Sequence, residues 1–193
     1  MPDMDRAGTR HSEILVAGFG GQGILTAGLI LAQAGLQEGR EVSWLPSYGP
    51  EMRGGTAHCH VVLSDEPVAS PLVTHPDILL LFNKPSLERF EPALRAGGYL
   101  IANSSLVPPA TRTDVRRVEL PATRMALEMG APEAANMVML GAMVASAGAV
   151  SFESLEAALP VVISKRHADK IPLDLEAIRK GMEAAAALVP QGA

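Results

Sequence analysis

A short run near the start of the chain, I-L-V-A-G-F-G-G-Q-G-I-L-T-A-G at residues 14–28, constrains the fold more than any other feature. Residues 13–17 are mostly apolar and should form a buried strand, and the glycines that follow allow a tight turn. An apolar helix is expected next, over residues 23–37. Large and small apolar residues occupy most of its circumference, so this helix should be buried on more than one side. The run predicts the first strand–turn–helix unit of an α/β domain.

Further strands and helices are expected along the rest of the chain. The link between the second and third strands is only about ten residues, short for a helical crossover, which predicts an antiparallel strand there. The predicted fold class is α/β: a three-layer α/β/α, Rossmann-like, mostly parallel sheet with at least one antiparallel strand and a helical C-terminal region. The later strands are expected at residues 42–45, 57–63, 77–82, 99–103 and 115–120, and the later helices at residues 86–96, 134–147, 152–163 and 173–188.

The length of 193 residues suits one domain. We expect a single domain over residues 12–188, preceded by a flexible N-terminal arm over residues 1–11. Hydrophobic residues make up 48% of the chain and charged residues 19%, which suits buried strands covered by helices on both faces. The apolar content also leaves surface for a subunit interface, or for self-association when the chain is alone.

Several classes of protein are disfavoured by the sequence. The formal net charge is −5 with no basic stripe, so nucleic-acid binding is not expected. The N-terminal residues lack the apolar core of a signal peptide and no apolar run is long enough for a membrane span, which favours a cytoplasmic protein. The single cysteine, Cys59, cannot hold an iron–sulfur cluster, which normally takes four ligands, or form an internal disulfide.

The glycine turn at Gly18–Gly23 matches G-x-G-x-x-G, a pattern that cradles the pyrophosphate of a dinucleotide between a strand and a helix. A nicotinamide site also needs an acidic residue at the end of the second strand, where it binds the ribose. Glu41 begins that strand, which ends with L-P-S at residues 45–47 and offers no carboxylate. A dinucleotide site and a tight turn that binds no ligand both stay open.

A second loop rich in glycine and proline, P-S-Y-G-P-E-M-R-G-G-T at residues 46–56, follows the second strand. The carboxyl ends of neighbouring strands in a doubly wound sheet face one crevice, so this loop should lie on the same side as the glycine turn. Arg53 could bind a carboxylate, a phosphate or an acidic residue of a partner there, or it could be a solvated loop charge. The candidate binding residues are Gly20, Gly21, Gln22, Gly23, Ser47, Tyr48, Arg53 and Gly54.

Taken together, G-F-G-G-Q-G and S-Y-G-P-E-M-R-G-G resemble the gamma subunit of the 2-oxoacid:ferredoxin oxidoreductases. The resemblance runs from residue 14 to about residue 183. The second motif is more similar to the 2-oxoglutarate and branched-chain 2-oxoacid members than to the pyruvate members. Further matches follow in the same order, namely S-D-E-P at residues 64–67, N-K-P-S-L at 83–87, G-G-Y-L-I-A-N-S-S at 97–105, N-M-V-M-L-G-A at 136–142 and S-x-E-S-L-E-A-A-L at 151–159.

This resemblance implies a complex that decarboxylates a 2-oxoacid such as 2-oxoglutarate, reduces ferredoxin and transfers the acyl group to coenzyme A. Alpha and beta subunits would hold thiamine diphosphate and magnesium, and a ferredoxin-like delta subunit would hold iron–sulfur clusters. The chain itself is then expected to bind no cofactor tightly, to supply no catalytic residue and to be inactive alone. Its two loops are expected to shape the entrance for coenzyme A or the 2-oxoacid, with Arg53 holding an anionic group.

Two other functions stay open: a self-sufficient NAD(P)- or flavin-dependent oxidoreductase, and an interaction scaffold whose glycine turn binds nothing. His58 and His60 share one face of a predicted strand, but Cys59 faces the other side and no third ligand follows, so we predict no metal site. Asn136 begins an apolar helix and could serve either the structure or a partner contact.

Overall fold

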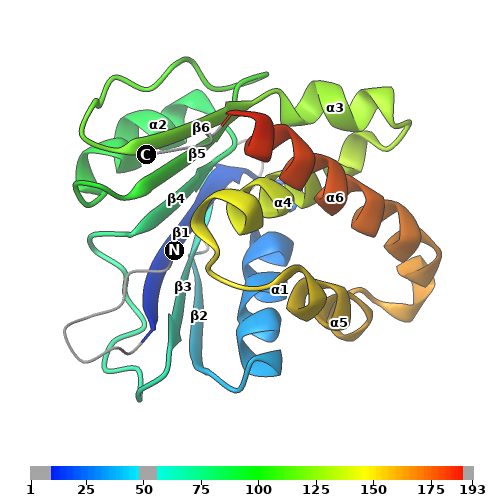
Figure 1. Cartoon of the computed structure of the whole chain (residues 1–193), viewed down its shortest axis with the longest axis horizontal. Coiled ribbons are helices and arrows are strands. Elements are labelled where there is room, and N and C mark those ends of the chain that lie inside the picture. The colour runs from blue at the N-terminus through cyan, green and yellow to red at the C-terminus, as the bar shows by residue number, and fades with distance from the viewer. Residues whose placement is uncertain (1–9, 48–55, 189–193) are drawn as a thin grey trace.

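The computed structural model describes residues 10–47 and 56–188, which form a sheet of six strands with helices on both sides (Figure 1). The strands lie in the order β2-β3-β1-β4-β5-β6. They are β1 (His11–Phe19), β2 (Glu41–Ser47), β3 (Thr56–Ser64), β4 (Ile78–Leu81), β5 (Tyr99–Asn103) and β6 (Arg116–Leu120). The α-helices are α1 (Ile24–Gln37), α2 (Lys84–Phe90), α3 (Ala122–Glu128), α4 (Ala135–Ala147), α5 (Phe152–Val162) and α6 (Ile171–Leu188).

The sheet is mixed because one strand runs against the others. β1, β4, β5 and β6 pair in parallel, whereas β3 pairs antiparallel with both β1 and β2. The short link between Ser47 and Thr56 makes β2 and β3 a hairpin, which is the reason for the reversal. The predicted α/β class, with an antiparallel strand and a helical C-terminal region, is confirmed.

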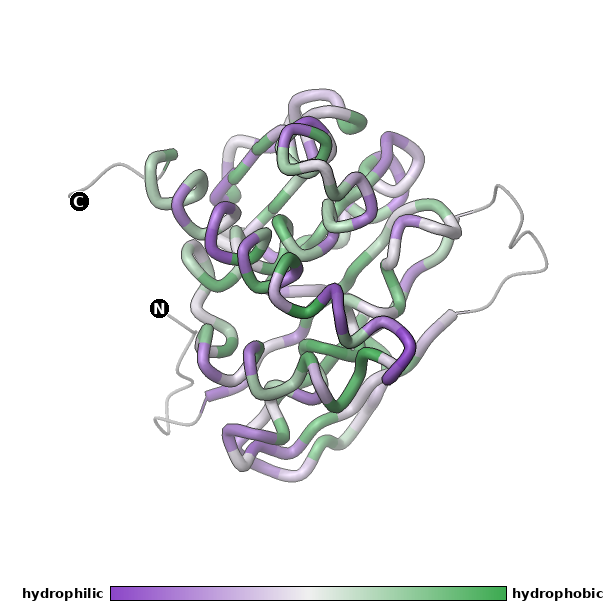
Figure 2. The backbone as a smooth tube through the Cα atoms, turned by 90° about the vertical axis from the view of Figure 1, so that its right-hand side faces the viewer, coloured by the Kyte–Doolittle hydropathy of each residue, from purple (hydrophilic) through white to green (hydrophobic). Residues whose placement is uncertain are grey.

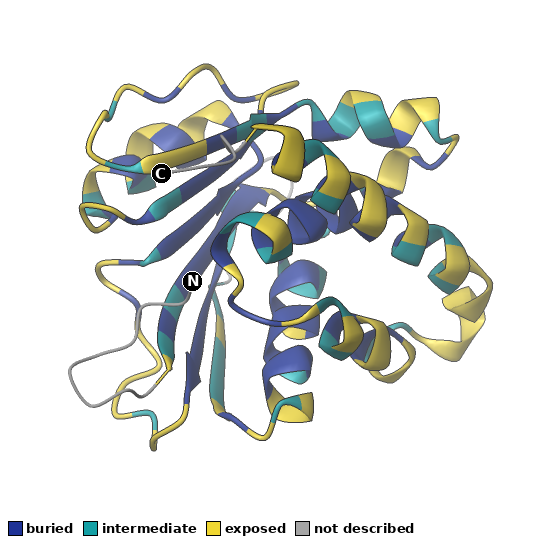
Figure 3. Cartoon of the chain, in the orientation of Figure 1, coloured by how far each residue is buried: buried dark blue, intermediate teal, exposed yellow. Residues whose placement is uncertain are grey.

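The two faces of the sheet carry cores of different size. Helices α1, α4, α5 and α6 contribute to the larger core, which includes Val16, Leu80 and Ile101 of the central strands. The smaller core on the other face lies under α2 and the segment at residues 104–115 and includes Leu79. The central strands are buried on both faces (Figure 3), and the hydrophobic stretches of the chain gather mostly in the middle of the molecule (Figure 2). This arrangement is a three-layer α/β/α domain.

Helix α4 is the central helix of the larger core, and it is buried from Asn136 to Met143. Helix α6 crosses it so closely that glycine is required on both sides. A Cβ atom on Gly141 would overlap the backbone carbonyl of Ile178, and one on Gly181 would overlap that of Val138. This crossing attaches the C-terminal helix to the core.

Some boundaries differ from those predicted, and one helix was not predicted. β1 begins at His11, two residues before the predicted strand start, and Arg10 pairs with Asp65 at 3.1 Å. The helix predicted at residues 86–96 is α2, which starts earlier because the Asn83 side chain accepts a hydrogen bond from the backbone N–H of Ser86 (2.8 Å). Helix α3 was not predicted, since it is short and buries little besides two alanines. The division into an arm and a single domain over residues 12–188 stays a prediction.

Candidate functional site

The glycine turn and the base of the second loop meet at the carboxyl edge of the parallel strands. β1 ends at Phe19, which pairs with Thr56 at the start of β3. β2 ends at Ser47, which pairs with His58. One strand, β3, therefore separates the glycine turn from Ser47, and both lie at the carboxyl edge. Tyr48, Arg53 and Gly54 lie outside the described residues.

The turn between β1 and α1 depends on two glycines in the left-handed region. Gly21 has φ +94°, and Gly23, the N-cap of α1, has φ +73°. Gly20 and Gly21 are exposed. The N-terminus of α1 has no side-chain cap and no acidic residue in its first turn. An uncapped helix N-terminus of this length favours a negative charge, so the turn offers exposed backbone on the side where an anion would be stabilised.

Gln22 holds this turn in place with both ends of its side-chain amide. Its Oε1 accepts a hydrogen bond from the backbone N–H of Phe19 (2.6 Å). Its Nε2 donates to the backbone carbonyl of Phe82 (3.2 Å), directly after β4. β1 and β4 are adjacent strands, so the amide closes the gap between their carboxyl ends. In this conformation Gln22 positions the turn, and its amide is already occupied.

Asn136 supports the same turn from the opposite side. Its Nδ2 donates to the carbonyl oxygen of Gly23 (3.3 Å), and its Oδ1 accepts from the backbone N–H of Met137 (3.0 Å). A Cβ atom on Gly23 would collide with the Asn136 side chain. The N-termini of α1 and α4 therefore contact each other at the turn. Asn136 was left undecided from the sequence, and the structure shows that it has a structural role.

Asparagines also end the next two strands. Asn83 follows β4 and caps α2. Asn103 ends β5, where its Oδ1 accepts from the backbone N–H groups of Ser105 and Thr123, and its Nδ2 donates to Thr123 Oγ1 (2.8 Å). The sequence did not predict either residue as part of the site. Asn83 begins the motif N-K-P-S-L, and Asn103 lies in the motif G-G-Y-L-I-A-N-S-S. They form the carboxyl edge together with Gln22.

The two edges of the sheet differ in charge. The described carboxyl-edge segments at residues 19–23, 82–83, 103–106 and 121–123 contain no charged side chain, although the exposed Lys84 and Arg124 directly follow two of them. The amino edge, in contrast, carries ion pairs between Arg10 and Asp65, between Arg95 and Asp77, and between Arg112 and Asp114. Charged residues are depleted from the centre of protein–protein interfaces. The charge-poor segments at the centre of the described carboxyl edge therefore suit a surface that another chain covers.

The face of β3 toward α2 carries the two histidines. Burial, followed by the neighbouring His60 and Arg89, lowers the pKa of His58 to about 4. Burial also lowers the pKa of His60, whose Nδ1 accepts the backbone N–H of Val73 (3.3 Å). Both imidazoles are therefore neutral at pH 7. Among residues 10–47 and 56–188 there is no group of three or more His, Cys, Asp or Glu side chains placed to hold a metal ion.

Cys59 faces the opposite side of β3 and is fully buried under α1. Burial raises the pKa of its thiol to about 12. A buried thiol of this kind does not suit cluster ligation, which uses thiolates.

Within the described residues of β2, no acidic residue takes the place that a nicotinamide site requires. Glu41 is the first residue of β2, at the amino edge, and β2 ends in Pro46 and Ser47 at the carboxyl edge. A dinucleotide site needs a carboxylate at the carboxyl end of β2 to bind the ribose, and β2 has none there. In the described part of the chain, no helix combines the length and apolar character needed to cross a membrane.

Comparison with known proteins identifies close relatives of this sequence. KorC, a 2-oxoglutarate synthase subunit of Methanocaldococcus jannaschii, is 39% identical over 91% of this chain and 94% of its own length. VorA, a ketoisovalerate oxidoreductase subunit of Methanothermobacter marburgensis, is 46% identical over 75% of this chain. The chain spans only 30% of the length of VorA, so VorA is a much longer protein.

Two solved structures share the fold. The gamma subunit of a keto/oxoacid ferredoxin oxidoreductase from Geobacter sulfurreducens matches with a TM-score of 0.78 and 31% identity, over 91% of this chain and 99% of that one. The 2-oxoglutarate:ferredoxin oxidoreductase of Magnetococcus marinus matches with a TM-score of 0.82 and 28% identity, over 93% of this chain and 32% of that one. The family model for pyruvate ferredoxin/flavodoxin oxidoreductase matches residues 13–184. The chain therefore belongs to the pyruvate ferredoxin/flavodoxin oxidoreductase family and has the fold of its gamma subunits.

Proposed function

We propose that this chain is the gamma subunit of a 2-oxoacid:ferredoxin oxidoreductase complex, and that its carboxyl-edge loops border the path by which coenzyme A or the 2-oxoacid reaches the active site. The relatives support the first part, since KorC and VorA are both named as subunits of 2-oxoacid oxidoreductases. Those names also support 2-oxoglutarate or a branched-chain 2-oxoacid as the substrate. The complex would be the oxidoreductase, and the isolated chain would be inactive.

The observation that carries the second part is the position of the glycine turn and of Ser47, which precedes the second loop. The glycine turn and Ser47 lie one strand apart at this edge, and the turn residues 19–23 carry no charged side chain. In open α/β sheets, ligands bind outside the carboxyl ends of the strands. An edge that is both the usual ligand side and poor in charge suits a site shared with a partner subunit.

The ligand group at this edge would be an anion. Gly20 and Gly21 expose backbone beside the uncapped N-terminus of α1, where the helix dipole favours negative charge. The proposed role of Arg53, with Ser47, Tyr48 and Gly54 beside it in sequence, is to bind the same group through its guanidinium. Gln22 would hold the turn and would not bind the ligand through its side chain, because its amide already has two partners.

The chemistry itself would belong to partner subunits. In VorA and in the Magnetococcus protein, the segment similar to this chain makes up about a third of a longer polypeptide, which supports close association with further domains. Here those partners would be alpha and beta subunits with thiamine diphosphate and magnesium, and a ferredoxin-like delta subunit with iron–sulfur clusters. Coenzyme A would be the co-substrate, and the complex would be cytoplasmic.

The role of the loops is tested by steady-state kinetics on the assembled complex. Replacing Arg53 with alanine should raise the KM for coenzyme A or for the 2-oxoacid about tenfold or more, since a hydrogen bond to a charged group contributes about 1.5–3 kcal/mol. Assembly, followed by size-exclusion chromatography, should not change. Lys165→Ala, which removes an exposed cation that belongs to neither loop, is the control. Unchanged KM values for both substrates in Arg53→Ala would contradict the proposed role of the loop.

A further inference from the structure

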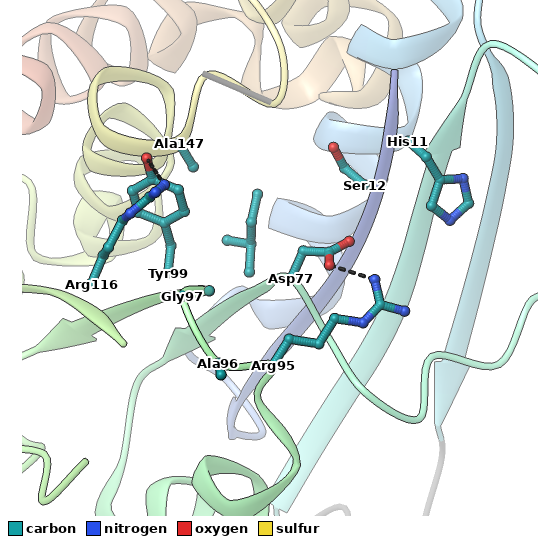
Figure 4. A pocket seen from close by; sticks show the side chains of 11 residues that line it. His11, Ser12, Asp77, Arg95, Ala96, Gly97, Tyr99, Arg116 and Ala147 are labelled. Carbon is teal, nitrogen blue, oxygen red and sulfur yellow. Dashed lines mark hydrogen bonds and ion pairs between the residues drawn. The ribbon is translucent and has the colours of Figure 1, made fainter. Parts of the chain in front are cut away.

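A cavity of about 600 Å³ opens at the amino edge of the sheet, opposite the glycine turn (Figure 4). It lies where β1, β4, β5 and β6 begin, and the last residue of α4, Ala147, also lines it. Its volume is in the range of small-molecule sites. The function proposed above uses the other edge of the sheet and assigns nothing to this cavity.

One side of the cavity carries a positive charge that is held in position. Arg116 Nη1 donates a hydrogen bond to the hydroxyl of Tyr99 (2.9 Å), and the guanidinium lies over the Tyr99 ring, with Cζ 5.0 Å from its centroid. None of the ion pairs formed within residues 10–47 and 56–188 includes Arg116. A guanidinium that is oriented by a neighbour but has no carboxylate partner is well suited to bind an anion.

The other charged side of the cavity holds Arg95 between two carboxylates. Arg95 contacts Asp77 Oδ1 through Nη1 (2.5 Å) and Glu13 Oε2 through Nη2 (2.8 Å). Asp77 Oδ2 also accepts the backbone N–H of Glu13 (2.8 Å). Figure 4 shows this pair across the cavity from Arg116 and Tyr99. One guanidinium thus faces two carboxylates, so this side of the cavity keeps a net negative charge. Arg116, on the other side, has no carboxylate partner among the described residues.

Apolar groups complete the lining. Ile78, Ala96 and Ala147 line the cavity, and Ile78 and Ala147 are almost fully buried. We infer that the cavity binds a small organic anion, with a carboxylate or phosphate group on Arg116 and an apolar part against Ile78 and Ala147. Such a site is separate from the proposed entrance at the carboxyl edge.

Arg116 also lies near the C-terminal end of α4, where a cation stabilises a helix through its dipole. That purely structural role would change the melting temperature without any ligand, but would leave no saturable response to an anion. The experiment therefore has to measure binding and not stability alone.

The test is calorimetric titration of the full chain with butyrate and with phenyl phosphate, which carry the two candidate head groups. Butyramide, which has the shape of butyrate without its charge, is the control ligand. The variants are Arg116→Gln and Arg117→Gln. Arg117 is the next residue of β6, is exposed, donates to the carbonyl of Ala110 (3.1 Å) and does not line the cavity.

We expect at least one of the two anions to bind the wild-type chain and the Arg117→Gln variant alike, and to bind Arg116→Gln at least tenfold more weakly. Circular dichroism should show both variants folded. The response to butyrate or to phenyl phosphate identifies the head group. Absence of binding by both anions, equal binding of butyramide, or equal loss in the two variants would overturn the inference.

Discussion

The side-chain amide of Gln22 donates a hydrogen bond to the backbone carbonyl of Phe82, 3.2 Å away, and so joins the carboxyl ends of β1 and β4. The same side chain accepts the N–H of Phe19. The glycine turn is therefore fixed across the point at which an α/β sheet commonly receives its ligand. A preorganised turn of this kind presents its backbone without a conformational cost on binding.

Removing this bridge should loosen the turn. Gln22→Ala is expected to lower the free energy of unfolding by about 1–2 kcal/mol, since two hydrogen bonds are lost. Gln22→Glu keeps the acceptor for Phe19 but places a carboxylate against the Phe82 carbonyl, so it should be no better than alanine. Urea unfolding measures both, with Gln37→Ala at the exposed end of α1 as the control. If Gln22→Ala is as stable as the control variant, the bridge does not contribute to stability.

The crossing of α4 and α6 should not tolerate a side chain. Gly141→Ala and Gly181→Ala each place a methyl group against the backbone of the other helix. Each should destabilise the chain by about 1–3 kcal/mol or more, as overpacking does. Thermal unfolding tests this, with the exposed Ala145→Ser on α4 as a matched substitution. Melting temperatures equal to that of Ala145→Ser would show that the two helices can move apart freely.

The buried thiol of Cys59 should be unreactive in the folded chain. Its pKa of about 12 leaves almost no thiolate at pH 8, and burial blocks access. Mass spectrometry after treatment with iodoacetamide should find no alkylation in native buffer and complete alkylation in denaturant. Rapid native alkylation would mean that α1 opens away from β3.

His58 should make stability depend on pH. Its pKa is about 4 in the folded chain and near 6.5 when unfolded, so the unfolded chain binds the extra proton first as the pH falls. The contribution of neutral His58 to the free energy of unfolding is fully present above pH 6.5 and is lost between about pH 6.5 and 4. This loss is at most about 1.4 kcal/mol for each unit by which the two pKa values differ.

The His58→Phe variant should lose less stability than the wild-type chain between pH 7 and pH 5, as measured by urea unfolding. Comparing the two chains cancels the opposite contribution of Asp174, whose pKa burial raises to about 6. Identical pH profiles would show that His58 titrates normally in the folded chain.

Much of the fold could be predicted because it depends on local signals. The length of the link between Ser47 and Thr56 predicted the reversal of β3, and the glycines after β1 predicted the start of α1. The predicted boundaries of α2 were less accurate. The Asn83 cap sets the start of this helix, and the apolar pattern that follows is too weak to show where it begins. Local patterns decide the type of an element better than its ends.

The site was less predictable because its contacts are distant in sequence. Asn136 contacts Gly23 from 113 positions away, and Gln22 reaches Phe82 from 60 positions away. The motif shows that Gln22 follows two glycines. It does not show that the Gln22 side-chain amide makes hydrogen bonds to Phe19 and Phe82. The Arg116–Tyr99 pair depends on the parallel pairing of β5 and β6, which no local pattern specifies.

The most direct test of the central claim is purification of the tagged chain from its native cell, followed by identification of bound subunits and a ferredoxin-reduction assay. We predict that it is recovered with thiamine diphosphate-binding and iron–sulfur subunits, and that the assembly reduces ferredoxin only when a 2-oxoacid and coenzyme A are both present. The chain expressed alone should show no activity. Recovery as a lone, active protein carrying its own nicotinamide or flavin would contradict the account.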